Sequence, residues 1–138
     1  MSYLLDTNVV SEFARPKPSS RVLAWIGTVP DQALHVSVLT LGEIRSGIEQ
    51  LRDLSRREKL RIWLETDLRA WFGPRVLTID ANVADRWGRL VAAAGRSLPM
   101  IDSLLAASAL RYGLRLVTRN TSDFDFPGLE VVNPWASS

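Results

Sequence analysis

Short apolar runs alternate along the chain with longer segments in which apolar residues recur every three or four positions. Runs of the first kind are typical of buried strands, and segments of the second kind are typical of helices with one buried face. We therefore predict strands over residues 3–5, 33–37, 75–79, 114–118 and 129–134. The helical pattern predicts a short helix directly after residue 6 and further helices over 20–27, 38–51, 54–71, 81–94 and 98–112.

The regular alternation of strands and helices also predicts the fold class. It indicates an α/β protein whose central sheet has four to five mainly parallel strands, with helices on both faces. The chain contains no internal repeat, no low-complexity segment and no linker long enough to divide it. We therefore expect residues 1–138 to form a single domain.

The composition is that of a globular protein without a membrane anchor. Of the 138 residues, 46% are hydrophobic, and a chain of this size can bury a core without cross-links. No run approaches the roughly 18 uninterrupted apolar residues that suggest a membrane span. Asp6 and Glu12 interrupt the N-terminal apolar stretch, so we expect no secretory signal peptide and a cytoplasmic location.

The chain lacks cysteine, and its one histidine is His35. These facts exclude disulfides, thiol catalysis and thiolate metal sites, and they leave oxygen atoms as the main metal ligands available. The formal net charge is +2, and Lys17 and Lys59 are the only lysines among 17 basic residues. Arginine suits phosphate recognition, although the same residues also fit solvated helix faces.

Four carboxylates lie where predicted strands end or helices begin: Asp6, Glu43, Asp102 and Asp123. Glu43 falls one position off the apolar stripe of its helix, which predicts a place at the buried margin. Since the carboxyl ends of parallel strands open on one edge of a sheet, the four acids are expected to lie near each other there. Aspartate also caps helices, and helix capping would by itself explain both Asp6, when it is considered alone, and Asp80.

Convergence of four carboxylates requires a counter-charge. Two carboxylates about 4 Å apart repel by roughly 4 kcal/mol at an effective dielectric constant near 20. A hard divalent cation, Mg²⁺ or Mn²⁺, takes such oxygen ligands, whereas zinc would need histidine or cysteine. A metal-activated water can attack a phosphodiester, so the acids predict phosphodiester hydrolysis.

Four short motifs also resemble a known family. They are Leu5-Asp6-Thr7-Asn8-Val9-Val10-Ser11-Glu12, Ser37-Val38-Leu39-Thr40-Leu41-Gly42-Glu43-Ile44, Ile101-Asp102-Ser103-Leu104-Leu105-Ala106-Ala107 and Val117-Thr118-Arg119-Asn120-Thr121-Ser122-Asp123-Phe124. In this order and spacing they resemble the PIN-domain ribonucleases, and the chain from Tyr3 to Asn133 resembles the toxins of bacterial VapBC and FitAB toxin–antitoxin pairs.

The resemblance implies an Mg²⁺- or Mn²⁺-dependent endoribonuclease toxin. By it, Asp6, Glu43, Asp102 and Asp123 would be the catalytic, metal-binding acids, and Thr7, Asn8, Thr118 and Asn120 would orient ligands or substrate. The resemblance further implies an RNA substrate, a homodimer and a small VapB- or FitA-like antitoxin, which together with the toxin would bind operator DNA in a bacterial cytoplasm.

Two other functions remain open at this point. Aspartyl-phosphate phosphatases also begin with an aspartate at a strand end, but they need a second acid two residues later, where this chain has Asn8. The other alternative is a catalytically inactive PIN-like module that acts only as the antitoxin's co-repressor partner. The intact set of four acids favours the nuclease over both.

Overall fold

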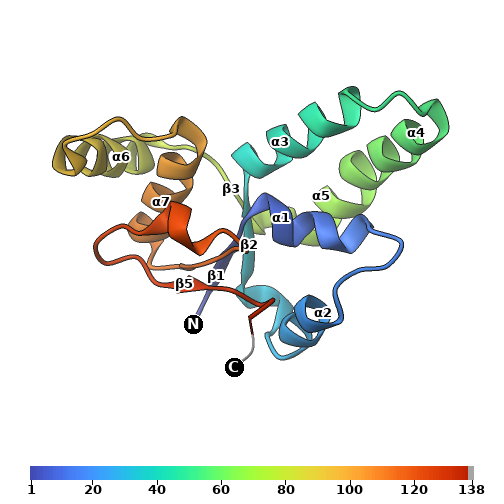
Figure 1. Cartoon of the computed structure of the whole chain (residues 1–138), viewed down its shortest axis with the longest axis horizontal. Helices are drawn as coiled ribbons and strands as arrows, with labels where there is room; N and C mark the ends of the chain where they lie inside the picture. The colour runs from blue at the N-terminus through green and yellow to red at the C-terminus, as the bar shows by residue number, and fades with distance from the viewer. Residues whose placement is uncertain (137–138) are drawn as a thin grey trace.

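A computed structural model of the protein, which describes residues 1–136, contains the predicted parallel sheet (Figure 1). Its strand order is β3-β2-β1-β4-β5, and all four pairings are parallel. The strands are β1 (Tyr3–Leu5), β2 (Leu34–Ser37), β3 (Val76–Leu77), β4 (Arg115–Val117) and β5 (Val131–Val132). The predicted fold class, an α/β domain with four to five mainly parallel strands, is confirmed.

Helices flank the sheet on two sides. One side carries α6 (Ala81–Ala94) and α7 (Met100–Tyr112), and the other carries α1 (Thr7–Val10), α2 (Ser20–Gly27), α3 (Val38–Glu49), α4 (Leu54–Ile62) and α5 (Arg69–Phe72). Four 3₁₀ turns complete the connections: η1 (Ser11–Ala14), η2 (Asp31–Ala33), η4 (Gly73–Arg75) and η5 (Thr121–Phe124). No helix within residues 1–136 is long and apolar enough to cross a membrane.

Two apolar clusters hold the layers together because neighbouring strand residues face opposite sides of the sheet. Leu4 and Leu116 belong to the cluster formed with α6 and α7. Leu5 and Val117 belong to the cluster formed with α2, α3 and α5. The inner strands β1, β2 and β4 are therefore buried on both faces, which explains their continuous apolar sequence.

The registers of the three inner strands bring their carboxyl ends together. Leu5 of β1 lies opposite Val36 of β2 on one side and Val117 of β4 on the other. The residues that follow these strands therefore leave the sheet at the same edge. This edge receives Asp6, the start of α3 and Thr118.

The structure differs from the predicted elements in the helix predicted over 54–71, in both edge strands, of which the last is only Val131–Val132, and by one or two residues at other element ends. The helix predicted over 54–71 contains a π-helical segment, η3 (Trp63–Leu68), between α4 and α5. The wider π turn keeps Leu64, Leu68 and Phe72, which are four residues apart, on one buried face. The strand predicted over 75–79 is only two residues long, because Arg75 belongs to η4 and the sheet ends at this edge strand.

Candidate functional site at the carboxyl edge of the sheet

Asp6 is held rigidly at the end of the central strand. It is 7% exposed and caps α1, where its Oδ1 accepts a hydrogen bond of 2.7 Å from the backbone N–H of Thr7. Its Oδ2 accepts a hydrogen bond of 2.8 Å from the hydroxyl of Thr118, which follows the neighbouring strand β4. The capping interpretation of Asp6 is therefore correct, but capping uses only part of its bonding capacity.

The buried hydroxyl of Thr118 connects the other polar residues predicted to orient ligands. It accepts hydrogen bonds from Nδ2 of Asn8 at 3.3 Å and from the backbone N–H of Asn120 at 3.1 Å. The backbone N–H of Arg119 donates to Oδ1 of Asn8 at 3.3 Å. Asn8, Thr118 and Asn120 thus form one network around Asp6, in which Asn120 takes part through its backbone.

Glu43 reaches the same edge from the first turns of α3. Its Oε1 accepts a hydrogen bond of 2.6 Å from the hydroxyl of Thr7. The side chain is exposed, so the expectation that it lies at the buried margin of the helix is wrong. This hydrogen bond places the Glu43 carboxylate beside Thr7, the residue that follows Asp6.

The charges of the four acids act on one another. Partial burial raises the pKa of Asp102, and the negative charges of Asp6, Asp123 and Glu43 raise it further. Desolvation raises the pKa of Asp6 against the opposing hydrogen bonds from Thr118 and Thr7, and the charges of Glu43 and Asp123 add to the increase. The fold therefore brings the four predicted acids within electrostatic reach of each other.

The donor set suits a hard divalent cation, although it is not closed around one. None of the four acids forms an ion pair with a residue of the described chain, and every side-chain ligand they offer is an oxygen. Within residues 1–136, no three acidic or histidine side chains already stand in an arrangement that would hold an ion. Among residues 1–136, no hydrogen bond fixes the carboxylates of Asp102 and Asp123, and the oxygen donors present fit such an ion.

Sequence reasoning assigned no role to Glu12, which the structure buries to 3% exposure. Its carboxylate accepts hydrogen bonds from Nη1 of Arg15 at 2.8 Å and from the backbone N–H of Ser19 at 2.9 Å. Desolvation, the largest single influence, would raise its pKa, but these two bonds and the charges of Arg15 and Arg119 together lower it. Glu12 fixes the proline-containing loop after η1. Its position inside an apolar stripe of the sequence was the available indication that it would be buried.

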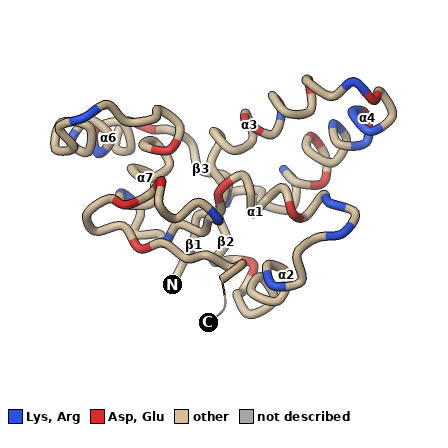
Figure 2. The backbone as a smooth tube through the Cα atoms, in the orientation of Figure 1, with Lys and Arg blue, Asp and Glu red and all other residues tan. Residues whose placement is uncertain are grey.

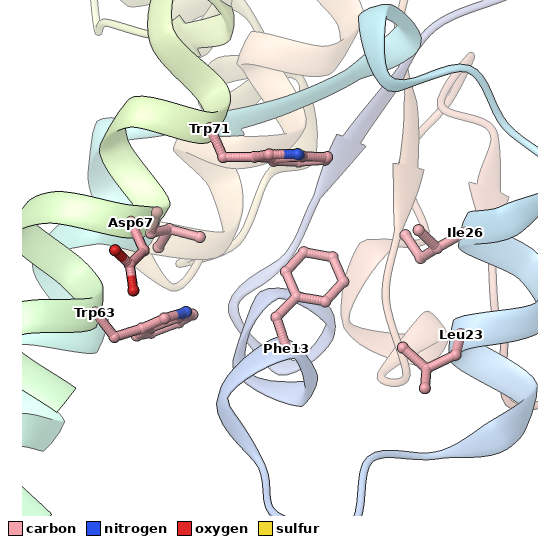
Figure 3. A pocket seen from close by; sticks show the side chains of 7 residues that line it. Phe13, Leu23, Ile26, Trp63, Asp67 and Trp71 are labelled. Atoms are coloured by element: carbon pink, nitrogen blue, oxygen red, sulfur yellow. The ribbon is translucent and has the colours of Figure 1, made fainter. Parts of the chain in front are cut away.

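A separate apolar groove lies on the side of α2 and α5. None of the four acids lines it, although its Trp63 also lines the neighbouring pocket that contains Thr7 and Glu43. The groove encloses about 370 Å³. Figure 3 shows Trp63 and Trp71 on one wall, Leu23 and Ile26 on the other, and Phe13 between them. The rings of Phe13 and Trp71 meet edge to face with centroids 6.1 Å apart. The groove contains no polar cluster and does not resemble a catalytic site.

The fold and the site define an α/β protein with an acidic centre at the carboxyl edge of a parallel sheet. Residues 3–126 match the family model of the PIN domain. The chain belongs to the PIN-domain family, as the four motifs predicted.

Relatives of similar length extend the match over nearly the whole chain. The plasmid stability protein StbB of Pseudomonas syringae pv. tomato is 39% identical, covering 96% of this chain and 97% of StbB. The VapC ribonuclease Y4jK of Sinorhizobium fredii is 34% identical over 96% of both chains. The toxin FitB of Neisseria gonorrhoeae is 33% identical, with 96% and 97% covered.

Solved structures give the same result for the fold. The structure of FitAcB from Neisseria gonorrhoeae superposes with a TM-score of 0.88 at 32% identity, covering 98% of this chain and 99% of the other. A structure of FitAB bound to an IR36 DNA fragment also gives a TM-score of 0.88, at 30% identity and with 99% and 97% covered.

Proposed function

We propose that the protein is the ribonuclease toxin of a toxin–antitoxin pair, an endoribonuclease that hydrolyses RNA phosphodiester bonds with Mg²⁺ or Mn²⁺. The observation that carries the proposal is that Asp6, Glu43, Asp102 and Asp123 lie within electrostatic reach of each other, with Thr7 bonded to both Asp6 and Glu43. Support comes from the relatives named VapC ribonuclease and toxin FitB, each at least 33% identical over 96% of this chain.

Each residue of the site has a part in this chemistry. Asp6, Glu43, Asp102 and Asp123 would hold the cation, which when bound neutralises the developing charge on the phosphate and favours ionisation of a water molecule. Thr118 and the Thr7 N–H keep the Asp6 carboxylate in one orientation. Asn8 and the N–H of Asn120 keep the Thr118 hydroxyl directed at Asp6, because both donate to its oxygen.

The test is cleavage of RNA by the purified protein, with the new ends identified by sequencing. We expect cleavage in Mg²⁺ or Mn²⁺, none in EDTA, and a loss of roughly 10²-fold or more for Asp6→Asn. Asp31→Asn removes an exposed carboxylate outside the site and serves as the matched control. Full cleavage by Asp6→Asn, or in EDTA, would contradict the proposal.

The proposed partners are a small antitoxin, a second copy of the chain and operator DNA. The similar structures of FitAcB and of FitAB bound to DNA support an antitoxin and a DNA-bound assembly. The apolar groove lined by Phe13, Leu23 and Trp71 also supports a protein partner, since exposed apolar surface of this kind is typical of interaction sites.

The second candidate function is an inactive co-repressor partner of the antitoxin. It shares the partners of the proposed toxin but not the chemistry. Expression of the chain without its antitoxin separates the two: a toxin arrests growth and its Asp6→Asn variant does not, whereas a co-repressor is tolerated in both forms.

A further inference from the structure

Three arginines line a pocket on the α6 side of the molecule. Arg86 and Arg89 lie three residues apart on α6, and Arg96 follows the glycine that ends this helix. Gly95 has a φ of 64°, and this left-handed residue turns the chain so that Arg96 returns beside the last turn. Figure 2 shows the basic positions of this region along α6.

The pocket has an excess of positive charge and an apolar floor. It encloses about 340 Å³ over Leu90 and Phe126, and Asp125 is its only acidic lining residue. Arg89 pairs with the exposed Asp85 at 3.2 Å. Arg86 and Arg96 form no hydrogen bond, ion pair or ring contact with any residue of 1–136, although Arg86 is half-buried.

A half-buried guanidinium without a partner favours an anionic ligand. Partial removal from water costs free energy that a bound anion restores. Arginine binds phosphate with two parallel hydrogen bonds. The positive charge of three arginines around one pocket is also larger than the negative charge of a single carboxylate such as Asp125. The chemistry of the lining therefore fits a phosphate group.

The pocket also lies next to the acidic site. Asp125 lines it, and Asp123 of the acidic site is two residues earlier in the chain, so their Cα atoms are at most about 7 Å apart. A flexible strand whose scissile phosphate lies at the acids therefore reaches the pocket by continuing past Asp123 and Asp125.

We infer that the pocket of Arg86, Arg89 and Arg96 binds the backbone of the RNA substrate beside the scissile phosphate. The identity of the substrate rests on the proposed ribonuclease function. Asp125 at the rim repels the backbone and so directs it toward the arginines. In this arrangement the pocket contributes affinity through phosphates and does not read bases.

The test measures binding separately from cleavage. A fluorescein-labelled single-stranded RNA of about 12 nucleotides is titrated with the full chain in EDTA, at several salt concentrations, and a gel verifies that the RNA stays intact. Arg86→Gln/Arg96→Gln is compared with the parent and with Arg52→Gln, an exposed arginine without a partner in the described chain. Arg96→Gln alone is included because it changes only an exposed residue.

Each phosphate contact with a single strand contributes about 0.7 to the slope of log affinity against log salt. The double variant should therefore lose about 1.4 in slope and about tenfold in affinity near 0.15 M salt, Arg96→Gln about half of each, and Arg52→Gln nothing. The inference is overturned if both pocket variants bind RNA with the affinity and the salt dependence of the parent. It is also overturned if the variants lose binding to the antitoxin while their RNA binding stays unchanged. If the parent binds RNA as expected but cleaves none with Mg²⁺ or Mn²⁺, the proposed function fails while the binding site stands.

Discussion

At the scale of single residues, the site depends on a hydroxyl that carries no charge. Thr118 is buried and donates to Asp6 while it accepts from Asn8 and Asn120. Asp6 supplies the negative charge, but Thr118 determines the orientation of the Asp6 carboxylate. Substitutions at the two positions should therefore affect different properties.

Thr118→Val keeps the shape of the side chain and removes the hydroxyl. Because it leaves Oδ2 of the buried Asp6 and Nδ2 of the half-buried Asn8 without their hydrogen bonds to this hydroxyl, we expect a loss of about 1–3 kcal/mol in the free energy of unfolding. Loss of the orienting bond should also lower RNA cleavage by roughly 10- to 100-fold. Thr118→Ser is the control, and a valine variant as stable and active as the serine variant would refute the role of the hydroxyl.

Asp102 should make the metal-free protein less stable as the pH rises. Its pKa is raised in the fold, so the protonated form is favoured there, and this contribution to stability is present in acid and lost as the pH rises through the folded value. Asp102→Asn should therefore raise the melting temperature in EDTA at pH 7 and change it little near pH 3.

With added Mg²⁺ at pH 7, the parent should have a higher melting temperature than Asp102→Asn, the reverse of the order in EDTA. A ligand that binds only the folded state raises the melting temperature, and the parent should gain more than Asp102→Asn because it keeps the carboxylate. Calorimetry at pH 3 and pH 7, with Asp31→Asn beside it, measures both effects. Equal gains in Mg²⁺ for parent and variant would show that Asp102 does not contribute to the metal site.

At the scale of elements, most of the fold follows from local pattern, and the exceptions have local causes. The periodicity of Leu60, Leu64 and Leu68 predicts a helix, but it does not reveal the π turn, whose segment packs between α4, α5 and α3. The residues of the site could be predicted because Asp6 and Thr118 directly follow strands and Glu43, Asp102 and Asp123 lie in the first turns of the helices or turns near the same edge. The exposure of Glu43 and the burial of Glu12 could not, because they depend on how α3 and the loop after η1 pack.

Arg75 joins three elements, and its sequence context gives no sign of this role. Its guanidinium donates to the carbonyls of Asp31, Leu34 and Trp71. It also lies 4.6 Å from the ring centroid of Trp71 and 5.4 Å from that of Phe72. The end of α5 is thereby attached to the start of β2.

We expect Arg75→Lys to lose about 1–3 kcal/mol in the free energy of unfolding, although the charge is kept. A lysine ammonium cannot reproduce the planar fork that serves several carbonyls and two rings at once. Urea denaturation measures the loss, and Arg69→Lys on the exposed face of α5 is the control. Parental stability of Arg75→Lys would mean that positive charge alone is sufficient at this position.

At the scale of the whole molecule, chemistry and exposed apolar surface are separated. The acids lie at the carboxyl edge of the sheet, whereas the groove of Phe13, Leu23 and Trp71 lies between α2 and α5. None of the four acids lines the groove, so a partner can occupy it without displacing their carboxylates. In the proposed pair, binding strength and control of catalysis would come from different parts of the antitoxin.

Leu23→Asp should weaken binding of the antitoxin by roughly tenfold or more, because it places a charge in the apolar groove. Leu23 is already 43% exposed, so the free protein should remain folded. Leu54→Asp, at a residue that is 72% exposed and outside the groove, is the control. Titration of labelled antitoxin into each variant gives the affinities, and equal values would exclude the groove as the contact.

The pairing of β1 with β4 has a consequence for the order of events during synthesis. Residues 3–5 leave the ribosome first, yet their partners at 115–117 and the hydroxyl of Thr118 come near the end of translation. A nascent chain therefore carries Asp6 and Glu43 for most of its elongation without the second half of its pocket. In the proposed toxin, the same topology that centres the first strand would keep the catalytic site incomplete until the polypeptide is almost finished.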